Sequence, residues 1–152
     1  MDHQQLPEEF KQRMKGQLSP EEYTNFIRHY ENPAPVSIRA NPLKGYKPKE
    51  ALEQVPWSEN GFYLPERPVF TLDPAFHGGA YYVQEASSMF IGDVFRQLFD
   101  AETPIKILDL SAAPGGKSTQ LASLMNSQSL LVANEVIRAR AGILEENLVK
   151  WG

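Results

Sequence analysis

The sequence contains no cysteine among its 152 residues. This absence excludes disulfides, thiolate metal sites and a cysteine nucleophile within the chain. Histidine is also scarce, and the three that occur, at positions 3, 29 and 77, show no metal-ligand spacing. We therefore expect no metal site.

Long apolar runs and an excess of positive charge are missing as well. No run approaches the roughly 20 apolar residues that a membrane helix needs. The first residues, MDHQQLPEEF, lack the charged-then-apolar pattern of a signal peptide. We expect a cytoplasmic protein without a membrane partner. The net charge of −4 and the pI of about 5.4 argue against a basic surface over the whole chain.

Proline is abundant but unevenly placed, since ten of the twelve prolines lie before residue 75. This distribution predicts short, interrupted elements in the first half of the chain. The last third instead has long periodic runs with few residues that break helices or strands. The sequence predicts a small mixed α+β region over residues 1–75 and a second domain that begins at residue 76.

The first region contains recognisable helix signals. Apolar residues four apart predict a helix over residues 6–15. The segment SPEEY predicts another helix start, in which Ser19 and Glu22 form a capping box around Pro20. We further expect a strand over 36–40, a short helix over 48–55, and an irregular segment with one or two strands over 56–75.

The second region alternates between helix and strand patterns. We expect helices over 85–99, 118–125 and 137–151, and strands over 105–110 and 130–133. The strand 130–133 is apolar enough to be buried on both faces, as parallel strands are. Strand–helix–strand–helix order predicts an α/β fold with an incomplete Rossmann-like parallel sheet. Because two strands do not make a stable sheet of this kind, we expect the chain to be the first part of a longer protein.

The stretch LDLSAAPGGKSTQLA, residues 108–122, places a tight turn at the end of the first of these strands. Ligands of such sheets bind beyond the carboxyl ends of the strands. Small side chains and two glycines let backbone amides approach a ligand closely. The candidate cofactor-binding residues of the turn are Ser111, Ala112, Ala113, Pro114, Gly115, Gly116 and Lys117. Glu135, just past the next strand, can accept hydrogen bonds from two ribose hydroxyls, so a nucleoside-containing cofactor is favoured.

Three interpretations of the turn stay open on spacing alone. Gly116, Lys117 and Ser118 fit the end of a phosphate-binding loop, but Ser111 stands where that pattern requires its first glycine. S-adenosylmethionine fits without a phosphate cradle, because it carries a ribose and an amino-acid carboxylate. The third interpretation is a purely structural glycine turn.

A basic run lies in the first region. Residues 32–49 contain no acidic side chain, and Arg39, Lys44 and Lys47 are candidates for contacts with RNA phosphates, with Tyr46 among them. The alternative is a solvated loop.

Several segments together resemble the RNA 5-cytosine methyltransferases of the Sun/NOL1/NOP2 type. These segments are LDLSAAPGGKSTQLASLM, LVANEV, PVSIRANPLK, VPWSENGFYL and GGAYYVQEASSMF. The resemblance covers nearly the whole chain, and the Ala-Ala-Pro-Gly-Gly-Lys turn is its most specific part.

The resemblance implies a function and a placement of residues. The turn 111–117 would line the methionine end of S-adenosylmethionine, Glu135 would hold the ribose, and Asp109 would order the turn or meet the methionine amino group. In the family, a downstream cysteine adds to cytosine C6 and so activates C5 for methylation. This chain has no such cysteine, so no catalytic residue is expected within it and it should be inactive alone.

The expected function is thus the N-terminal part of an RNA cytosine-C5 methyltransferase, with ribosomal RNA favoured over transfer RNA as the partner. Two alternatives remain: a non-catalytic RNA-binding module with a vestigial cofactor fold, and a phosphate-loop nucleotidase.

Overall fold

The structure is a computed structural model, and it describes residues 6–30, 32–48 and 50–152. Contacts divide the chain into two compact units, Met1–Pro35 and Val36–Gly152. This division differs from the domain boundary expected near residue 75, which stays a prediction about how the longer protein is organised.

The first unit is a pair of helices, α1 (Glu8–Gln17) and α2 (Pro20–His29). The capping box is confirmed. The Glu22 backbone N–H donates to Ser19 Oγ at 3.3 Å, and the Ser19 backbone N–H donates to Glu22 Oε2 at 2.9 Å. Aromatic contacts join the helices, with 6.2 Å between the ring centroids of Phe10 and Phe26.

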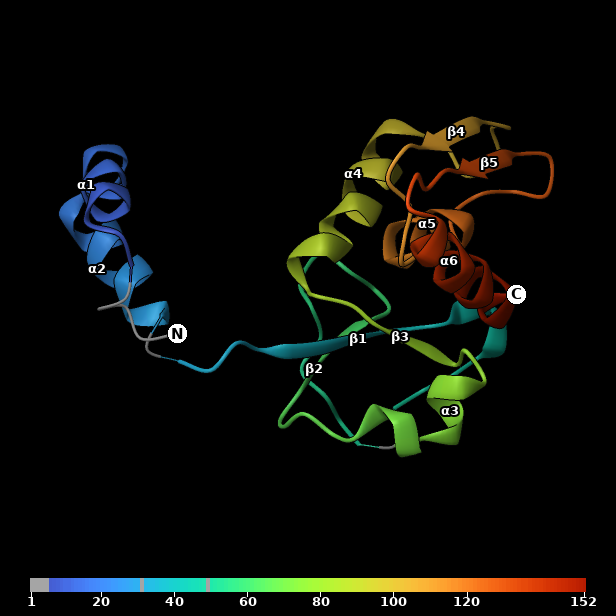
Figure 1. Cartoon of the computed structure of the whole chain (residues 1–152), viewed down its shortest axis with the longest axis horizontal. Coiled ribbons are helices and arrows are strands. Elements are labelled where there is room, and N and C mark those ends of the chain that lie inside the picture. Colours follow the sequence, from blue (N-terminus) through green and yellow to red (C-terminus); the bar gives the residue numbers. More distant parts are fainter. Residues whose placement is uncertain (1–5, 31, 49) are drawn as a thin grey trace. The chain divides into compact units, whose positions relative to one another are not determined.

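The second unit begins with a three-stranded antiparallel sheet (Figure 1). Its central strand is β1 (Val36–Ala40), flanked by β2 (Gly61–Leu64) and β3 (Tyr81–Val83). Short helical elements connect and follow these strands: η2 (Pro42–Lys44), η3 (Phe70–Leu72), α3 (Pro74–His77) and η4 (Ser87–Met89). The core beneath the sheet is built on Ile38, Phe70 and Tyr81.

The short helix expected over 48–55 was wrong. Among the described residues of that segment the backbone pairs with β2 instead, because Val55 N–H donates to Gly61 O at 2.9 Å and Tyr63 N–H donates to Glu53 O at 2.8 Å. Non-local pairing therefore overrides the weak helical pattern.

The expected strand–helix–strand–helix unit is confirmed. Strand β4 (Lys106–Asp109) pairs in parallel with β5 (Leu130–Ala133), and α5 (Gly116–Ala122) and α6 (Arg138–Trp151) follow them. Figure 1 shows α5 and α6 on the same side of the two strands. Helix α4 (Phe90–Leu98) precedes β4 and contacts α5.

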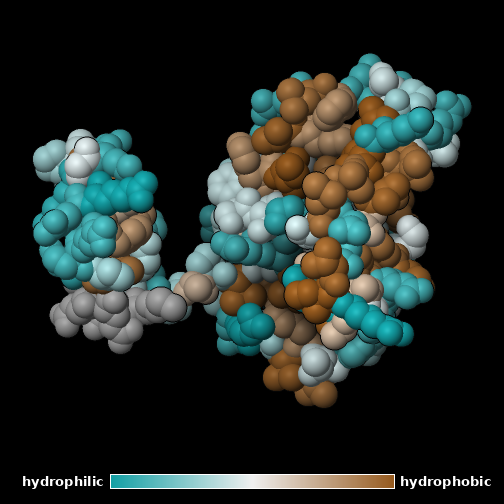
Figure 2. Space-filling view, turned by 45° about the horizontal axis from the view of Figure 1, so that its top comes forward, coloured by the Kyte–Doolittle hydropathy of each residue, from teal (hydrophilic) through white to brown (hydrophobic). Residues whose placement is uncertain are grey.

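The expectation that β5 is buried on both faces was wrong. Exposed and half-buried residues alternate along both strands, and Leu108 and Val132 are 60% and 47% exposed. Side chains of alternate residues point to opposite faces of a sheet, and only the face with α5 and α6 is covered by described residues. Figure 2 shows apolar surface gathered on this larger unit.

The C-terminal end of α6 is held against the antiparallel sheet by side chains that donate hydrogen bonds to the last carbonyl groups of the helix. Asn41 is fully buried, and its Nδ2 donates to Gly79 O at 2.9 Å and to Trp151 O at 2.8 Å. Lys44 Nζ donates to Gly78 O and Lys150 O. Carbonyls at a helix end otherwise lack partners, so the segment after β1 caps α6 and holds its end against the antiparallel sheet.

The Tyr81 hydroxyl provides a pH-dependent contribution to the stability of this unit. It donates to Asp73 Oδ2 at 2.6 Å, and burial, then this hydrogen bond, raises the pKa of Tyr81. Because the folded pKa lies above the unfolded value of about 10, the contribution is complete below pH ~10 and is lost as the pH rises toward the folded pKa. We expect Tyr81→Phe to be less stable than the wild type at pH ~8, with a difference that shrinks above pH ~10. Urea unfolding across this range tests it, and a constant difference would contradict it.

Candidate functional site

The turn after β4 is held in shape by Asp109. Its Oδ2 accepts from Ser118 Oγ at 2.6 Å, and its Oδ1 accepts from the Ser111 backbone N–H at 3.2 Å. Ser118 is completely buried. Of the two roles considered for Asp109, the structure thus shows the ordering of the turn.

Two side chains of helix α6 donate hydrogen bonds to backbone carbonyl groups of the same turn. Arg140 donates from NH2 to Ala113 O at 2.6 Å, and Asn147 Nδ2 donates to Pro114 O at 2.8 Å. The peptide between Ala113 and Pro114 is cis, and Gly115 has a φ of +112°. A side chain at Gly115 would adopt a strained backbone conformation and press on Leu144 of α6 at 3.3 Å.

A hollow of about 190 Å³ opens beside the turn. Six of the predicted residues line its turn side: Ser111, Ala112, Ala113, Pro114, Gly116 and Lys117. The opposite wall is formed by Tyr82–Glu85 and Ser88, which follow or belong to β3. The antiparallel sheet and the turn therefore share one concave surface, while Gly115 faces α6.

Glu135 lies just past β5, as expected, and its side chain is 4% exposed. Its Oε1 accepts from the Ile137 backbone N–H at 2.9 Å at the start of α6, and its Oε2 lies 3.4 Å from Arg140 NH1. A carboxylate has about four acceptor positions, so these two contacts leave capacity for further donors.

The structure does not bring Glu135 into the hollow of the turn. Glu135 lines a different hollow of about 390 Å³, along α6, with Leu144 and Leu148. Arg140 connects the two features, since one of its nitrogens contacts Glu135 and another contacts the turn. The sequence assigns the turn and Glu135 to one nucleoside-containing cofactor. In this structure they do not line a single shared cavity.

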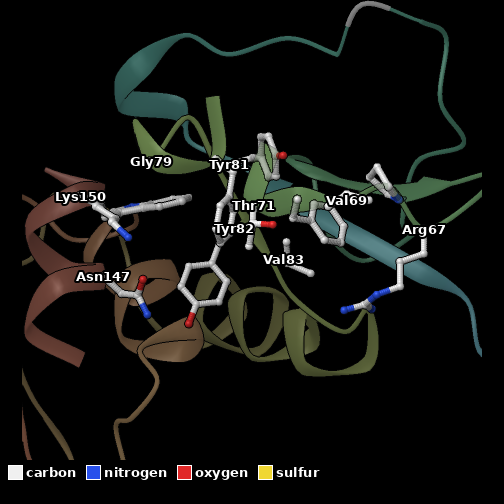
Figure 3. A pocket seen from close by; sticks show the side chains of 13 residues that line it. Arg67, Val69, Thr71, Gly79, Tyr81, Tyr82, Val83, Asn147 and Lys150 are labelled. Carbon is white, nitrogen blue, oxygen red and sulfur yellow. The ribbon is translucent and has the colours of Figure 1, made fainter. Parts of the chain in front are cut away.

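A larger hollow of about 460 Å³ adjoins the turn hollow on the other side of Tyr82. Figure 3 shows the Tyr82 ring, Asn147 and Lys150 toward one end of it and Arg67 toward the other. Four further aromatic side chains line it: Phe70, Phe76, Tyr81 and Trp151.

The basic run of residues 32–49 was predicted to contact RNA, but the structure uses two of its three candidate residues inside the protein. Arg39 is 2% exposed, so its interpretation as a surface contact with RNA phosphate is corrected. The Lys44 ammonium is bound to two backbone carbonyls. Of the three predicted residues, only Lys47 is exposed with no recorded partner among the described residues. The reason is that Arg39 belongs to β1, the central strand of the antiparallel sheet, whose residues 37–40 are all buried.

Arg140 and Asn147 are the residues that sequence analysis missed. Both look like ordinary polar positions of an exposed helix face. The only sequence feature that could have indicated them is their position, since they lie in the first and third turns of the helix that follows Glu135.

Comparison with known proteins now identifies the family. A family model described as the N-terminal domain of 16S rRNA methyltransferase RsmF matches residues 6–86, more than half of the chain. The chain belongs to this family. A second model, 16S rRNA methyltransferase RsmB/F, matches residues 97–152, and the resemblance to RNA methyltransferases drawn from the sequence is confirmed.

Individual relatives agree with the RsmF assignment. Ribosomal RNA small subunit methyltransferase F of Vibrio vulnificus strain YJ016 is 38% identical over 97% of this chain and 34% of its own length. The protein of the same name from Shewanella loihica is 36% identical over 91% of this chain and 30% of its own. The chain thus spans about a third of the length of the curated relatives it matches.

Solved structures confirm the Rossmann-like fold class of this RsmF-family chain. The crystal structure of PH0851 superposes with a TM-score of 0.79 at 27% identity, covering 96% of this chain and 34% of the other. A methyltransferase homolog protein from Pyrococcus horikoshii superposes with a TM-score of 0.73 at 32% identity, covering 90% and 47%.

Within the described residues, no helix is both long and apolar enough to cross a membrane. No group of three or more histidine or acidic side chains within residues 6–30, 32–48 and 50–152 has the geometry to hold a metal ion.

Proposed function

We propose that this chain is the N-terminal part of a cytoplasmic, S-adenosylmethionine-dependent methyltransferase that modifies C5 of a cytosine in ribosomal RNA. The observation that carries the proposal is the ordered turn 111–117 at the end of β4, which lines a hollow with the strand-end residues Tyr82–Glu85. The turn contributes mostly small side chains and backbone groups to this hollow, which suits the amino-acid end of the cofactor.

The proposal assigns a role to each part of the site. The turn residues bind the methionine end of the cofactor, with Lys117 at the rim. Glu135 lines a separate hollow, so the proposal requires the cofactor to extend from the turn to Glu135, whose unused acceptor positions then hold the ribose hydroxyls. Arg140 orients Glu135 and fixes the turn at once. The cofactor supplies an electrophilic methyl group. The nucleophile that activates cytosine lies outside this chain, which has no cysteine, so the chain alone is inactive.

The RNA contact of this part of the protein is proposed at Lys47 and not at Arg39 or Lys44. Lys47 is exposed, whereas the other two are used internally. Ribosomal RNA is favoured as the partner over transfer RNA, because the relatives are named for the small-subunit ribosomal RNA.

Cofactor binding tests the proposal. In the complete protein, Glu135→Ala should weaken S-adenosylhomocysteine binding about tenfold or more, because hydrogen bonds between a charged group and ligand hydroxyls contribute about 1.5–3 kcal/mol each. Titration calorimetry measures the change. Glu145→Ala is the matched control, because Glu145 is exposed and lines the same hollow without an assigned role.

The same titrations separate the alternatives. Unchanged affinity in Glu135→Ala would overturn the ribose assignment. Binding of ATP with Mg²⁺ in place of S-adenosylhomocysteine would favour a phosphate-loop nucleotidase. RNA binding with no binding of either nucleotide would favour a non-catalytic module.

A further inference from the structure

A buried cation without an acidic partner lies directly behind the turn hollow. Arg39 of β1 is 2% exposed. Its Nε donates to Gln84 Oε1 at 2.7 Å, and its NH2 donates to Gly116 O at 3.1 Å and to Thr119 Oγ1 at 2.6 Å. All of these acceptors are neutral. Among the described residues no carboxylate pairs with this guanidinium.

Aromatic rings complete the surroundings of the guanidinium. Its Cζ lies 4.2 Å from the centroid of the Trp151 ring and 5.9 Å from that of Tyr82. Such cation–π contacts stabilise a cation only partly. Burial lowers the pKa of Arg39 to about 9, which shows how unfavourable an uncompensated charge is at this position.

The contacts of Arg39 coincide with the walls of the hollow. Gln84, Gly116 and Tyr82 each touch Arg39 and each line the hollow next to the turn. The positive charge of Arg39 is thus separated from the hollow by neutral groups, while two exposed side chains of opposite charge, Glu85 and Lys117, also line the hollow. Charge interactions through a protein interior are much stronger than through water, so an anionic group in the hollow would relieve the uncompensated charge.

We propose that Arg39 is a positioning residue that holds Gly116 in place and supplies the positive potential that selects a carboxylate-bearing ligand in the turn hollow. The ligand class is an α-amino acid attached to a nucleoside, and the inference rests on the proposed function. Arg39 acts from behind the wall and does not touch the ligand.

A pair of ligands separates this electrostatic role from a structural one. S-adenosylhomocysteine carries the carboxylate, whereas its decarboxylated analogue lacks only that group. In the complete protein, Arg39→Gln should weaken S-adenosylhomocysteine about tenfold, the order expected for one charge several Å away at an effective dielectric constant of about 20. The decarboxylated analogue should bind with unchanged or higher affinity, and Arg39→Lys should restore most of the preference.

Equal weakening of the two ligands in Arg39→Gln would show a merely structural role and overturn the inference, as would no weakening of either. If neither ligand binds the wild-type protein, the proposed function fails instead, so the two failures are distinguishable.

A second variant decides the matter should Arg39→Gln not fold. Gln84→Glu keeps an oxygen acceptor for Arg39 Nε and adds the missing negative charge, but it removes the hydrogen bond that Gln84 Nε2 donates to Gln120 Oε1 at 3.2 Å. Circular dichroism therefore checks that the fold is retained before the titrations. We expect selective weakening of S-adenosylhomocysteine. Gln84→Met, which removes the contact without adding charge, is the matched control and should change the affinities of the two ligands by the same factor. The inference would be contradicted if Gln84→Met lost the preference for S-adenosylhomocysteine over its decarboxylated analogue. It would also be contradicted if Gln84→Glu kept that preference.

Discussion

Gly79→Ala is expected to lower the free energy of unfolding of the 152-residue chain by at least about 3 kcal/mol, or to prevent folding. Gly79 has a φ of +65°, and a Cβ added there would lie 2.1 Å from Lys150 O of α6. That neighbour is backbone, held in turn by Lys44. Neither side can move without breaking the junction between α6 and the antiparallel sheet. Urea unfolding followed by circular dichroism measures the effect.

Gly142→Ala is the control for this prediction. Gly142 lies inside α6, and an added Cβ would meet nothing within 4 Å. Alanine in a helix interior is favoured over glycine by about 0.5–1 kcal/mol, so this variant should be slightly more stable than the wild type. A Gly79→Ala variant whose unfolding midpoint equals that of the wild type would show that the junction is not rigid.

Trp151→Ala is expected to lower the free energy of unfolding by about 3–5 kcal/mol, the range for removing a large aromatic side chain from a core. Trp151 is 2% exposed, stacks on the Arg39 guanidinium, and donates from Nε1 to Ser123 Oγ at 2.8 Å. Its removal leaves a cavity beside an uncompensated buried cation. The same unfolding assay measures the loss.

Two variants separate the contributions of Trp151. Trp151→Phe keeps an aromatic ring over Arg39 but loses the hydrogen bond, so a smaller loss of about 1 kcal/mol plus a packing term is expected. Val149→Ala, at a 76% exposed position of the same helix, should change stability by no more than about 0.5 kcal/mol. A loss in Trp151→Ala no larger than that of Val149→Ala would mean that α6 does not dock through its last turn.

Local signals in the sequence were sufficient for much of the fold. The Ser19–Glu22 capping box, strand β1 and the βα alternation from residue 106 onward all depend on neighbours within a few residues. The turn 111–117 was predicted in the same way, because two glycines and a proline directly after an apolar strand indicate a turn.

Other features escaped the sequence because they depend on partners far along the chain. Strand β3 forms by pairing with β1, which lies more than 40 residues earlier in the chain. Arg39 looks like a surface cation, yet it contacts Gln84 and Thr119, 45 and 80 residues away. Nothing near Arg39 in sequence indicates that its strand is covered on both sides.

The sequence by itself determined the family, the strand–helix alternation from residue 106 onward and the turn after β4, since motif spacing and periodicity are properties of contiguous residues. The tertiary structure alone decided that the segment Arg39–Lys44 holds helices α5 and α6 against the antiparallel sheet. It also decided that Arg140 joins Glu135 to the turn, and that Glu135 and the turn line separate hollows. The physical reason is that burial, pairing of charges and closure of helix ends are set by which distant surfaces meet.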